Sequence, residues 1–148
     1  MPSTPVSYTH LDVYKRQQRK DTDVTDVHDY GGDLVRHRRA PGERPKLIGE
    51  CGGIAFSLDG HRWSPGWGYT RAPSAEAFVR RVGRLAAQPF EAEGLSGYVW
   101  TQLSDVEQEL NGLVHYDRTA KAPIEKLREA ILGLGAPSEA LVLSLIHI

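Results

Sequence analysis

Three short stretches of the chain carry the hydrophobic pattern of β-strands. Residues 24–28 (VTDVH) alternate apolar and polar side chains and include β-branched residues, which is typical of a half-exposed strand. Residues 46–50 (KLIGE) and 97–101 (GYVWT) are short, mostly apolar runs next to turn-forming or polar residues. We therefore expect three strands, each of which delivers a polar or aromatic side chain at its carboxyl end.

Helical spacing appears twice, after the second and third strands. Phe78, Val82 and Leu85 recur at helical intervals behind Ser74, a plausible N-cap, and Pro89 is expected to kink or end that helix. A second helix is expected over residues 121–134, with its end marked by Gly135 and Pro137. Its apolar face comprises four residues: Ile124, Leu127, Ile131 and Leu134.

Loops separate these elements, and the order of strands and helices indicates an α/β fold. Residues 33–45 are charged and contain two prolines, residues 51–73 are rich in glycine and tryptophan, and residues 103–119 form another long connection. Strands that alternate with helices favour a parallel sheet. The chain of 148 residues is too short for a (β/α)₈ (TIM) barrel of roughly 200 residues or more. We expect a partial barrel, made of the last three strands and their helices, although residues 33–45 lack the helix that a barrel would place there.

The amino-acid composition and the net charge limit the kinds of binding partner that we expect for this chain. Hydrophobic residues make up 40% and charged residues 25% of the chain, and the net charge is −1. This balance gives no indication of a nucleic-acid or membrane partner, and the basic cluster at residues 36–39 is expected to be a solvated loop. No apolar run is long enough to span a bilayer, and the single cysteine, Cys51, excludes an internal disulfide. No cofactor or metal is expected, and the sequence determines neither oligomeric state nor cellular location.

The two ends of the chain have unusual sequences that can be traced to one stretch of DNA. Residues 5–17 and 143–148 can be encoded by one DNA word, CTGTCTCTTATACACATCT, read in different frames and on both strands. That word resembles the mosaic-end adapter of transposase-based sequencing libraries. We therefore expect residues 1–17 and 143–148 to be translated adapter, and residues 18–142 to be the natural segment, part of a longer catalytic domain. His10 and His147 are accordingly set aside.

Glu50 is the leading candidate for chemistry. It follows an apolar strand, and the glycines at positions 49, 52 and 53 leave room for a ligand beside the backbone. A carboxylate in such a place can act as a nucleophile or a general base. A salt-bridged or capping glutamate at a strand end fits the same pattern.

Aromatic and polar residues end the neighbouring strands. Trp100 offers a flat face suited to a sugar ring, although a core tryptophan fits its position equally well. His28 and Tyr30, with Asp29 between them, are placed to hydrogen-bond the carboxylate or sugar hydroxyls. Trp67 either walls the pocket or packs its own loop. Because the carboxyl ends of parallel strands converge, these candidates strengthen one another.

Two weaker candidates were weighed and set aside. The acidic run after Trp100, at residues 105–109, lacks a clear pattern of metal ligands and is expected to be a solvated or hydrogen-bonding loop. Cys51 has no identifiable base beside it, so we expect a small core residue rather than a nucleophile.

Together these segments resemble the end of the catalytic barrel of glycoside hydrolase family 2, the group of β-galactosidases, β-glucuronidases and β-mannosidases. The resemblance covers about residues 24–132. Residues 27–30 (VHDY), 47–53 (LIGECGG) and 97–103 (GYVWTQL) look like its sixth, seventh and eighth strands.

Two further segments carry the same resemblance. Residues 63–69 are similar to the loop after the seventh strand, and residues 105–118 (DVEQELNGLVHYDR) are similar to a signature of one β-galactosidase-like branch. Cys51 departs from the family pattern, because an aromatic residue is more usual there.

The resemblance implies a retaining β-glycosidase with a carbohydrate substrate. Glu50 then corresponds to the nucleophile, Tyr30 to a hydrogen-bonding partner and Trp100 to the floor of the sugar subsite. The proton donor of the family is a glutamate that follows an asparagine, but the only asparagine here, Asn111, precedes a glycine. We therefore expect the parent protein to be a glycosidase and this chain alone to be inactive. The alternatives are a non-catalytic carbohydrate-binding or interaction domain, and another retaining (β/α)₈ glycosidase that acts within glucans or mannans.

Overall fold

The computed structural model of the protein describes residues 22–61 and 66–133. The expected adapter-derived tails and Trp63 lie outside the described residues. The described chain forms eight elements in the following order: β1 (Thr25–His28), the 3-10 helix η1 (Val35–His37), β2 (Lys46–Gly52), β3 (Ile54–Ala55), β4 (Thr70–Arg71), α2 (Ala75–Glu91), β5 (Leu95–Thr101) and α3 (Ile124–Leu132).

A three-stranded parallel sheet with the order β1-β2-β5 is the centre of the fold. The carboxyl ends of its strands therefore lie at one edge, with His28 paired to Glu50 and Cys51 paired to Trp100. The register shifts at three places, and two of these shifts, between Val27 and His28 and between Ile48 and Cys51, fall where the candidate residues begin. The α/β class and the parallel arrangement of the three predicted strands are confirmed.

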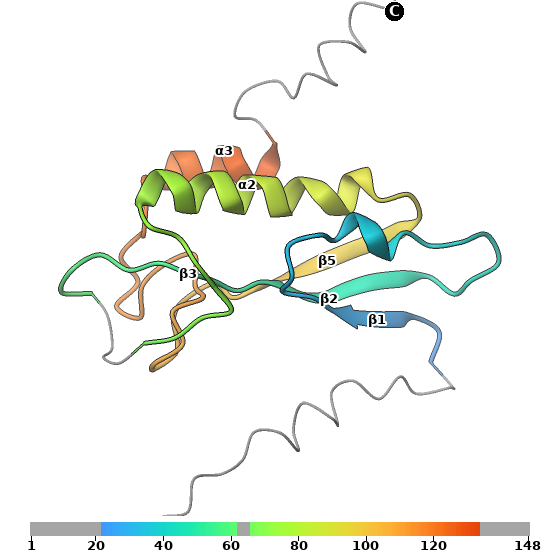
Figure 1. Ribbon diagram of the computed structural model, residues 1–148, viewed down its shortest axis with the longest axis horizontal. Coiled ribbons are helices and arrows are strands. Elements are labelled where there is room, and N and C mark those ends of the chain that lie inside the picture. The colour runs from blue at the N-terminus through green and yellow to red at the C-terminus, as the bar shows by residue number, and fades with distance from the viewer. Residues whose placement is uncertain (1–21, 62–65, 134–148) are drawn as a thin grey trace, which may run out of the picture.

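Helices α2 and α3 cover one side of the sheet (Figure 1). They pack against each other, and α2 also contacts β2, β3 and β5. Ser74 caps α2 by accepting a hydrogen bond from the backbone N–H of Ala77 at 3.2 Å. The core beneath the helices is a cluster of nine buried residues: Ile54, Phe56, Ala72, Ala77, Phe78, Val82, Leu85, Ala122 and Leu127.

A smaller buried cluster of Leu34, Ile48 and Cys51 lies between the 33–45 connection and the sheet. The 33–45 connection contains no α-helix, and Gln88 of α2 holds it in place by two hydrogen bonds. Its side-chain oxygen accepts from the backbone N–H of Leu34 at 2.5 Å, and its nitrogen donates to the carbonyl of Gly32 at 3.1 Å.

Several predicted boundaries were wrong. Strand β2 continues two residues past Glu50, and the predicted loop at 51–73 contains the parallel pair β3 and β4. Helix α2 continues past Pro89 to Glu91, because a proline so near the end removes only one backbone bond and its own ring is buried. Helix α3 ends at Leu132 and is capped by Gly133, which takes the left-handed conformation that favours glycine, rather than by Gly135.

Within the described residues, no helix has the length and apolar character needed to cross a membrane.

Candidate active site at the carboxyl ends of the strands

Glu50 lies near the end of β2, the central strand, and its side chain is 27% exposed. The hydroxyl of Tyr30 donates a hydrogen bond to its Oε2 atom at 2.8 Å. The Nδ1 atom of His28 lies 3.3 Å from the same oxygen. His28, the last residue of β1, and Tyr30, two positions further on, therefore both reach the carboxylate on the neighbouring strand.

Tyr30 connects the ends of all three strands. Burial raises its pKa well above the ordinary value; a hydrogen bond with Thr101 opposes this shift, whereas the hydrogen bond to Glu50 and its charge add to it. The phenol therefore keeps its proton and serves as a donor to Glu50. Thr101, the last residue of β5, was missed by the sequence reasoning, although its place beside Trp100 at a strand end was the available signal.

Two glycines after Cys51 make room for the aromatic residues of this site. Gly52 and Gly53 have φ angles of 103° and 62°, a backbone conformation that L side chains rarely adopt. A Cβ atom on Gly52 would lie 2.8 Å from the indole of Trp100, so that indole rests against the backbone of β2. A Cβ atom on Gly53 would lie 2.6 Å from the ring of Tyr30 and 2.7 Å from that of Tyr69.

Trp100 is a partly buried member of the packing around both hydrophobic clusters. Its indole nitrogen is buried and has no hydrogen-bond partner among the described residues. The indole thus packs beside Gly52 near the strand ends and also contacts the hydrophobic core.

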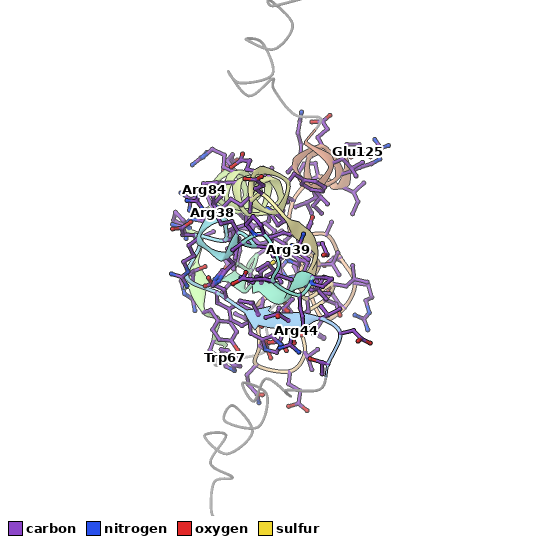
Figure 2. The ribbon with its side chains drawn as sticks, turned by 90° about the vertical axis from the view of Figure 1, so that its right-hand side faces the viewer. Arg38, Arg39, Arg44, Trp67, Arg84 and Glu125 are labelled. Atoms are coloured by element: carbon purple, nitrogen blue, oxygen red, sulfur yellow. The ribbon has the colours of Figure 1, made fainter. Side chains whose placement is uncertain are left out.

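Tyr30, Tyr69 and Trp67 form a second, partly exposed aromatic group near the strand ends. Tyr69 stacks on Tyr30 with ring centroids 3.6 Å apart and planes 2° from parallel, and Trp67 meets Tyr69 edge to face at 5.5 Å. Trp67 and Tyr69 remain 48% and 51% exposed. Figure 2 places Trp67 on the opposite side of the molecule from Arg84 of α2 and Glu125 of α3, away from the helical layer.

Backbone bonds fix Trp67 to the loop after β5. Its N–H donates to the carbonyl of Gln108 at 2.8 Å, and its own carbonyl accepts from the N–H of Leu110 at 2.8 Å. The loop after β2 and the loop after β5 therefore form one continuous wall, which sequence spacing alone does not predict.

Asp29 does not join the Glu50 cluster. Its carboxylate turns to the following loop, where it accepts from the N–H of Gly31 at 2.7 Å and contacts His37 at 2.5 Å and Arg36 at 2.6 Å. Burial would raise the pKa of Asp29, but the bonds from Gly31 and His37 and the charge of Arg36 hold it below its ordinary value. Asp29 is an ionised anchor for the loop before η1.

Cys51 is fully buried in the smaller cluster. Burial, with a contribution from the charge of Asp29, raises the pKa of its thiol to about 12. A thiol in this environment stays protonated and is a poor nucleophile, which agrees with the predicted core role.

The acidic run after β5 was only partly described by the prediction of a solvated loop. Asp105 is buried, and its Oδ1 atom accepts from Lys121 Nζ at 2.7 Å and from the N–H of Gly112 at 2.8 Å. Lys121 is also buried and donates to the carbonyl of Leu110 at 2.8 Å. This ion pair shapes the loop, and Lys121 precedes helix α3 rather than starting it. Across the described ranges, no group of three or more His, Cys, Asp or Glu side chains is arranged to hold a metal ion.

No protein-family model and no curated protein matches the sequence. Solved structures do resemble it. One is the glycoside hydrolase family 2 β-galacturonidase from Eisenbergiella tayi bound to glycerol, with 20% identity, a TM-score of 0.53, and coverage of 78% of this chain and 24% of that chain. The same enzyme bound to galacturonate matches with 20% identity, a TM-score of 0.53, and coverage of 78% and 25%.

A β-glucuronidase from Bifidobacterium dentium, complexed with coumarin-3-O-glucuronide, has 21% identity and a TM-score of 0.47 over 78% of this chain and 21% of that chain. That score is too low to bear on the fold. The two β-galacturonidase matches show that the described chain shares its fold with part of a family 2 glycoside hydrolase structure. The chain spans about a quarter of the length of those proteins.

Proposed function

We propose that this chain is the carboxyl-terminal part of the (β/α)₈ catalytic barrel of a retaining β-glycosidase, with Glu50 as the nucleophile. The observation that carries the proposal is the position of the Glu50 carboxylate. It lies near the carboxyl end of the central strand, accepts a bond from Tyr30 and faces His28. In (β/α)₈ barrels, chemistry takes place at the carboxyl ends of the strands.

The surroundings of Glu50 suit attack on an anomeric carbon. Tyr30 donates a hydrogen bond to the carboxylate and so helps to orient it, and a positioned carboxylate can serve as a nucleophile. In a retaining enzyme the carboxylate forms a covalent bond to the sugar while a second carboxyl group, about 5–5.5 Å away, protonates the leaving oxygen. Water then hydrolyses the glycosyl-enzyme and releases Glu50.

The aromatic residues suit a carbohydrate substrate. Trp100 forms the floor beside Gly52, and Trp67 extends the wall made by Tyr30 and Tyr69. Flat aromatic faces pack against the apolar faces of sugar rings, while His28 and Tyr30 carry polar atoms suited to hydroxyl groups. The similarity to β-galacturonidase structures supports a glycoside as the class of substrate.

The second carboxyl group belongs to a part of the parent protein outside this chain. The family pattern of an asparagine followed by a glutamate is absent, since Asn111 precedes Gly112. The 148-residue chain is therefore expected to show no turnover of aryl glycosides, and the parent gene is needed to test catalysis.

The decisive experiment recovers the parent gene from the genomic DNA that flanks residues 18 and 142. The parent enzyme and its Glu50→Gln variant are assayed with a panel of aryl β-glycosides, with Glu43→Gln as the control at an exposed glutamate that contacts Lys46. We expect Glu50→Gln to lower kcat by at least about a thousandfold and Glu43→Gln to leave it unchanged. A 2-fluoro glycoside should label the peptide that contains Glu50.

Unchanged turnover in Glu50→Gln would refute the nucleophile. An inactive parent that still binds sugars would favour a non-catalytic carbohydrate-binding domain, for which the exposed rings of Trp67 and Tyr69 are the supporting observation.

A further inference from the structure

A second carboxylate, on Asp26, approaches the candidate nucleophile through a histidine. The Oδ2 atom of Asp26 lies 2.9 Å from Nε2 of His28, and Nδ1 of the same ring lies 3.3 Å from Oε2 of Glu50. Asp26 and His28 are two residues apart on β1, so strand geometry places both side chains on the same face. One imidazole ring is thus held between two carboxylates.

The chain keeps a space for the Asp26 carboxylate. Gly49 precedes Glu50 on β2, and a Cβ atom at position 49 would lie 1.9 Å from Oδ1 of Asp26. Any other residue at this position would displace the carboxylate from its contact with His28. Asp26 is 54% exposed, so the fold does not depend on its burial, whereas His28 and Glu50 are only 21% and 27% exposed.

The contacts limit the protonation states of His28 that satisfy both neighbours. A neutral imidazole has one N–H donor and one acceptor nitrogen, so one of its nitrogens would face a carboxylate oxygen without a proton. The doubly protonated ring donates to Asp26 and to Glu50 at once, and charge-assisted bonds of this kind are stronger than neutral ones.

We propose that Asp26 is a positioning residue that holds the ring of His28 with Nδ1 directed at Glu50. The role in catalysis rests on the proposed function of Glu50. An N–H donor beside that carboxylate stabilises its charge before attack and again when it departs from the glycosyl-enzyme. Asp26 acts only through His28 and does not touch the substrate.

The ring of His28 can be observed directly in the 148-residue chain. The ¹⁵N chemical shifts of the histidine rings, recorded at pH 7 and assigned with a His28→Gln variant, report which nitrogens carry protons. We expect the doubly protonated population of His28 to be at least about threefold smaller in Asp26→Ala than in the wild-type chain, as suits one partly exposed ion pair. Asp23→Ala is the matched control, because it removes the same charge from an exposed position nearby.

Gly49→Ala supplies a second, independent perturbation. It leaves the charge of Asp26 in place but occupies the space of its carboxylate, so we expect the same change in the His28 signals as in Asp26→Ala. The double variant Asp26→Ala/Gly49→Ala should show no further change. The proposal would be overturned if the His28 signals of Asp26→Ala and of Gly49→Ala were the same as those of the control Asp23→Ala.

Kinetics of the parent enzyme separate this inference from the proposed function. We expect Asp26→Ala to lower kcat about tenfold with little change in KM, a factor that fits the loss of one charge-assisted hydrogen bond. Asp26→Asn should recover part of that loss, because its amide oxygen still accepts from Nε2–H. If Asp26→Ala keeps full activity while Glu50→Gln is inactive, only the proposed role of Asp26 is refuted. If Glu50→Gln keeps full activity, the assignment of Glu50 as the nucleophile is refuted, and the ring signals of His28 still test its contact with Asp26.

Discussion

Replacing Gly53 with alanine tests whether the aromatic wall of the site depends on the absence of a side chain at the turn after β2. Gly53 has a φ angle of 62°, and its Cβ position lies 2.6 Å from the ring of Tyr30 and 2.7 Å from that of Tyr69. The backbone conformation alone costs a residue with a side chain about 1–2 kcal/mol. Overlap with two stacked rings adds the cost of overpacking, about 1–3 kcal/mol.

Gly60 provides the matched control for this experiment. Its φ angle is 83°, and no atom of the described residues lies within 4 Å of its Cβ position. Gly60→Ala therefore carries the backbone cost without the overlap, and we expect it to be less destabilising than Gly53→Ala by about 1–3 kcal/mol. Urea unfolding of the two variants, followed by tryptophan fluorescence, gives the difference in the free energy of unfolding.

A change in near-UV circular dichroism should accompany Gly53→Ala only, because the stacked tyrosines must separate. Equal destabilisation by the two substitutions, with the tyrosine signal unchanged, would show that the rings do not occupy the space that Gly53 leaves.

Three further predictions concern buried groups outside the aromatic wall. Lys121→Met leaves the buried carboxylate of Asp105 without its cation and should lower the free energy of unfolding by about 3–5 kcal/mol, whereas Lys126→Met at an exposed pair should leave it nearly unchanged. Equal effects of the two substitutions in urea unfolding would contradict a buried ion pair. Burial, helped by the charge of Lys121, holds the pKa of His115 below its ordinary value, so the unfolded chain binds this proton first and stability should fall as the pH drops below about 6.5. His115→Gln should reduce the dependence of the free energy of unfolding on pH between about pH 5 and 7, a range above the pKa of ordinary carboxylates. The same dependence on pH in His115→Gln and in the wild-type chain would exclude His115 as the cause. Cys51, the only cysteine, has a pKa raised to about 12 by burial, so iodoacetamide at pH 8 should label the unfolded chain but not the folded one; rapid labelling of the folded chain would show an accessible thiolate.

The spacing of apolar and polar residues was sufficient to predict the three strands and helix α2, whose formation depends on residues close together in the sequence. Alternation and short apolar runs predicted the three parallel strands, and helical spacing behind Ser74 predicted α2, because these periodicities follow from backbone geometry. The boundaries were less predictable. Pro89 stays within α2 because its ring is buried, and Lys121 lies outside α3 because it pairs with Asp105, so in both cases contacts distant in sequence decided the outcome.

The candidate site shows the same division. Glu50, His28 and Tyr30 were predicted to converge because parallel strands end at one edge, and in the structure His28 and Tyr30 both contact Glu50. Thr101 and Asp26 were not predicted, since their relation to Glu50 depends on the register between strands. Asp29 shared a strand end with its neighbours but faces away from them, because successive residues along an extended chain point to opposite sides.

The sequence by itself therefore determined the α/β class, the parallel strands and the residue types gathered near Glu50, since each depends on local periodicity or on the shared direction of strands. Only the tertiary structure decided the stack of Tyr30 on Tyr69, the joining of the two long loops at Trp67 and the alignment of Asp26 with His28. These contacts depend on the shifts in strand register and on the space left by Gly49, Gly52 and Gly53, which act between segments far apart along the chain.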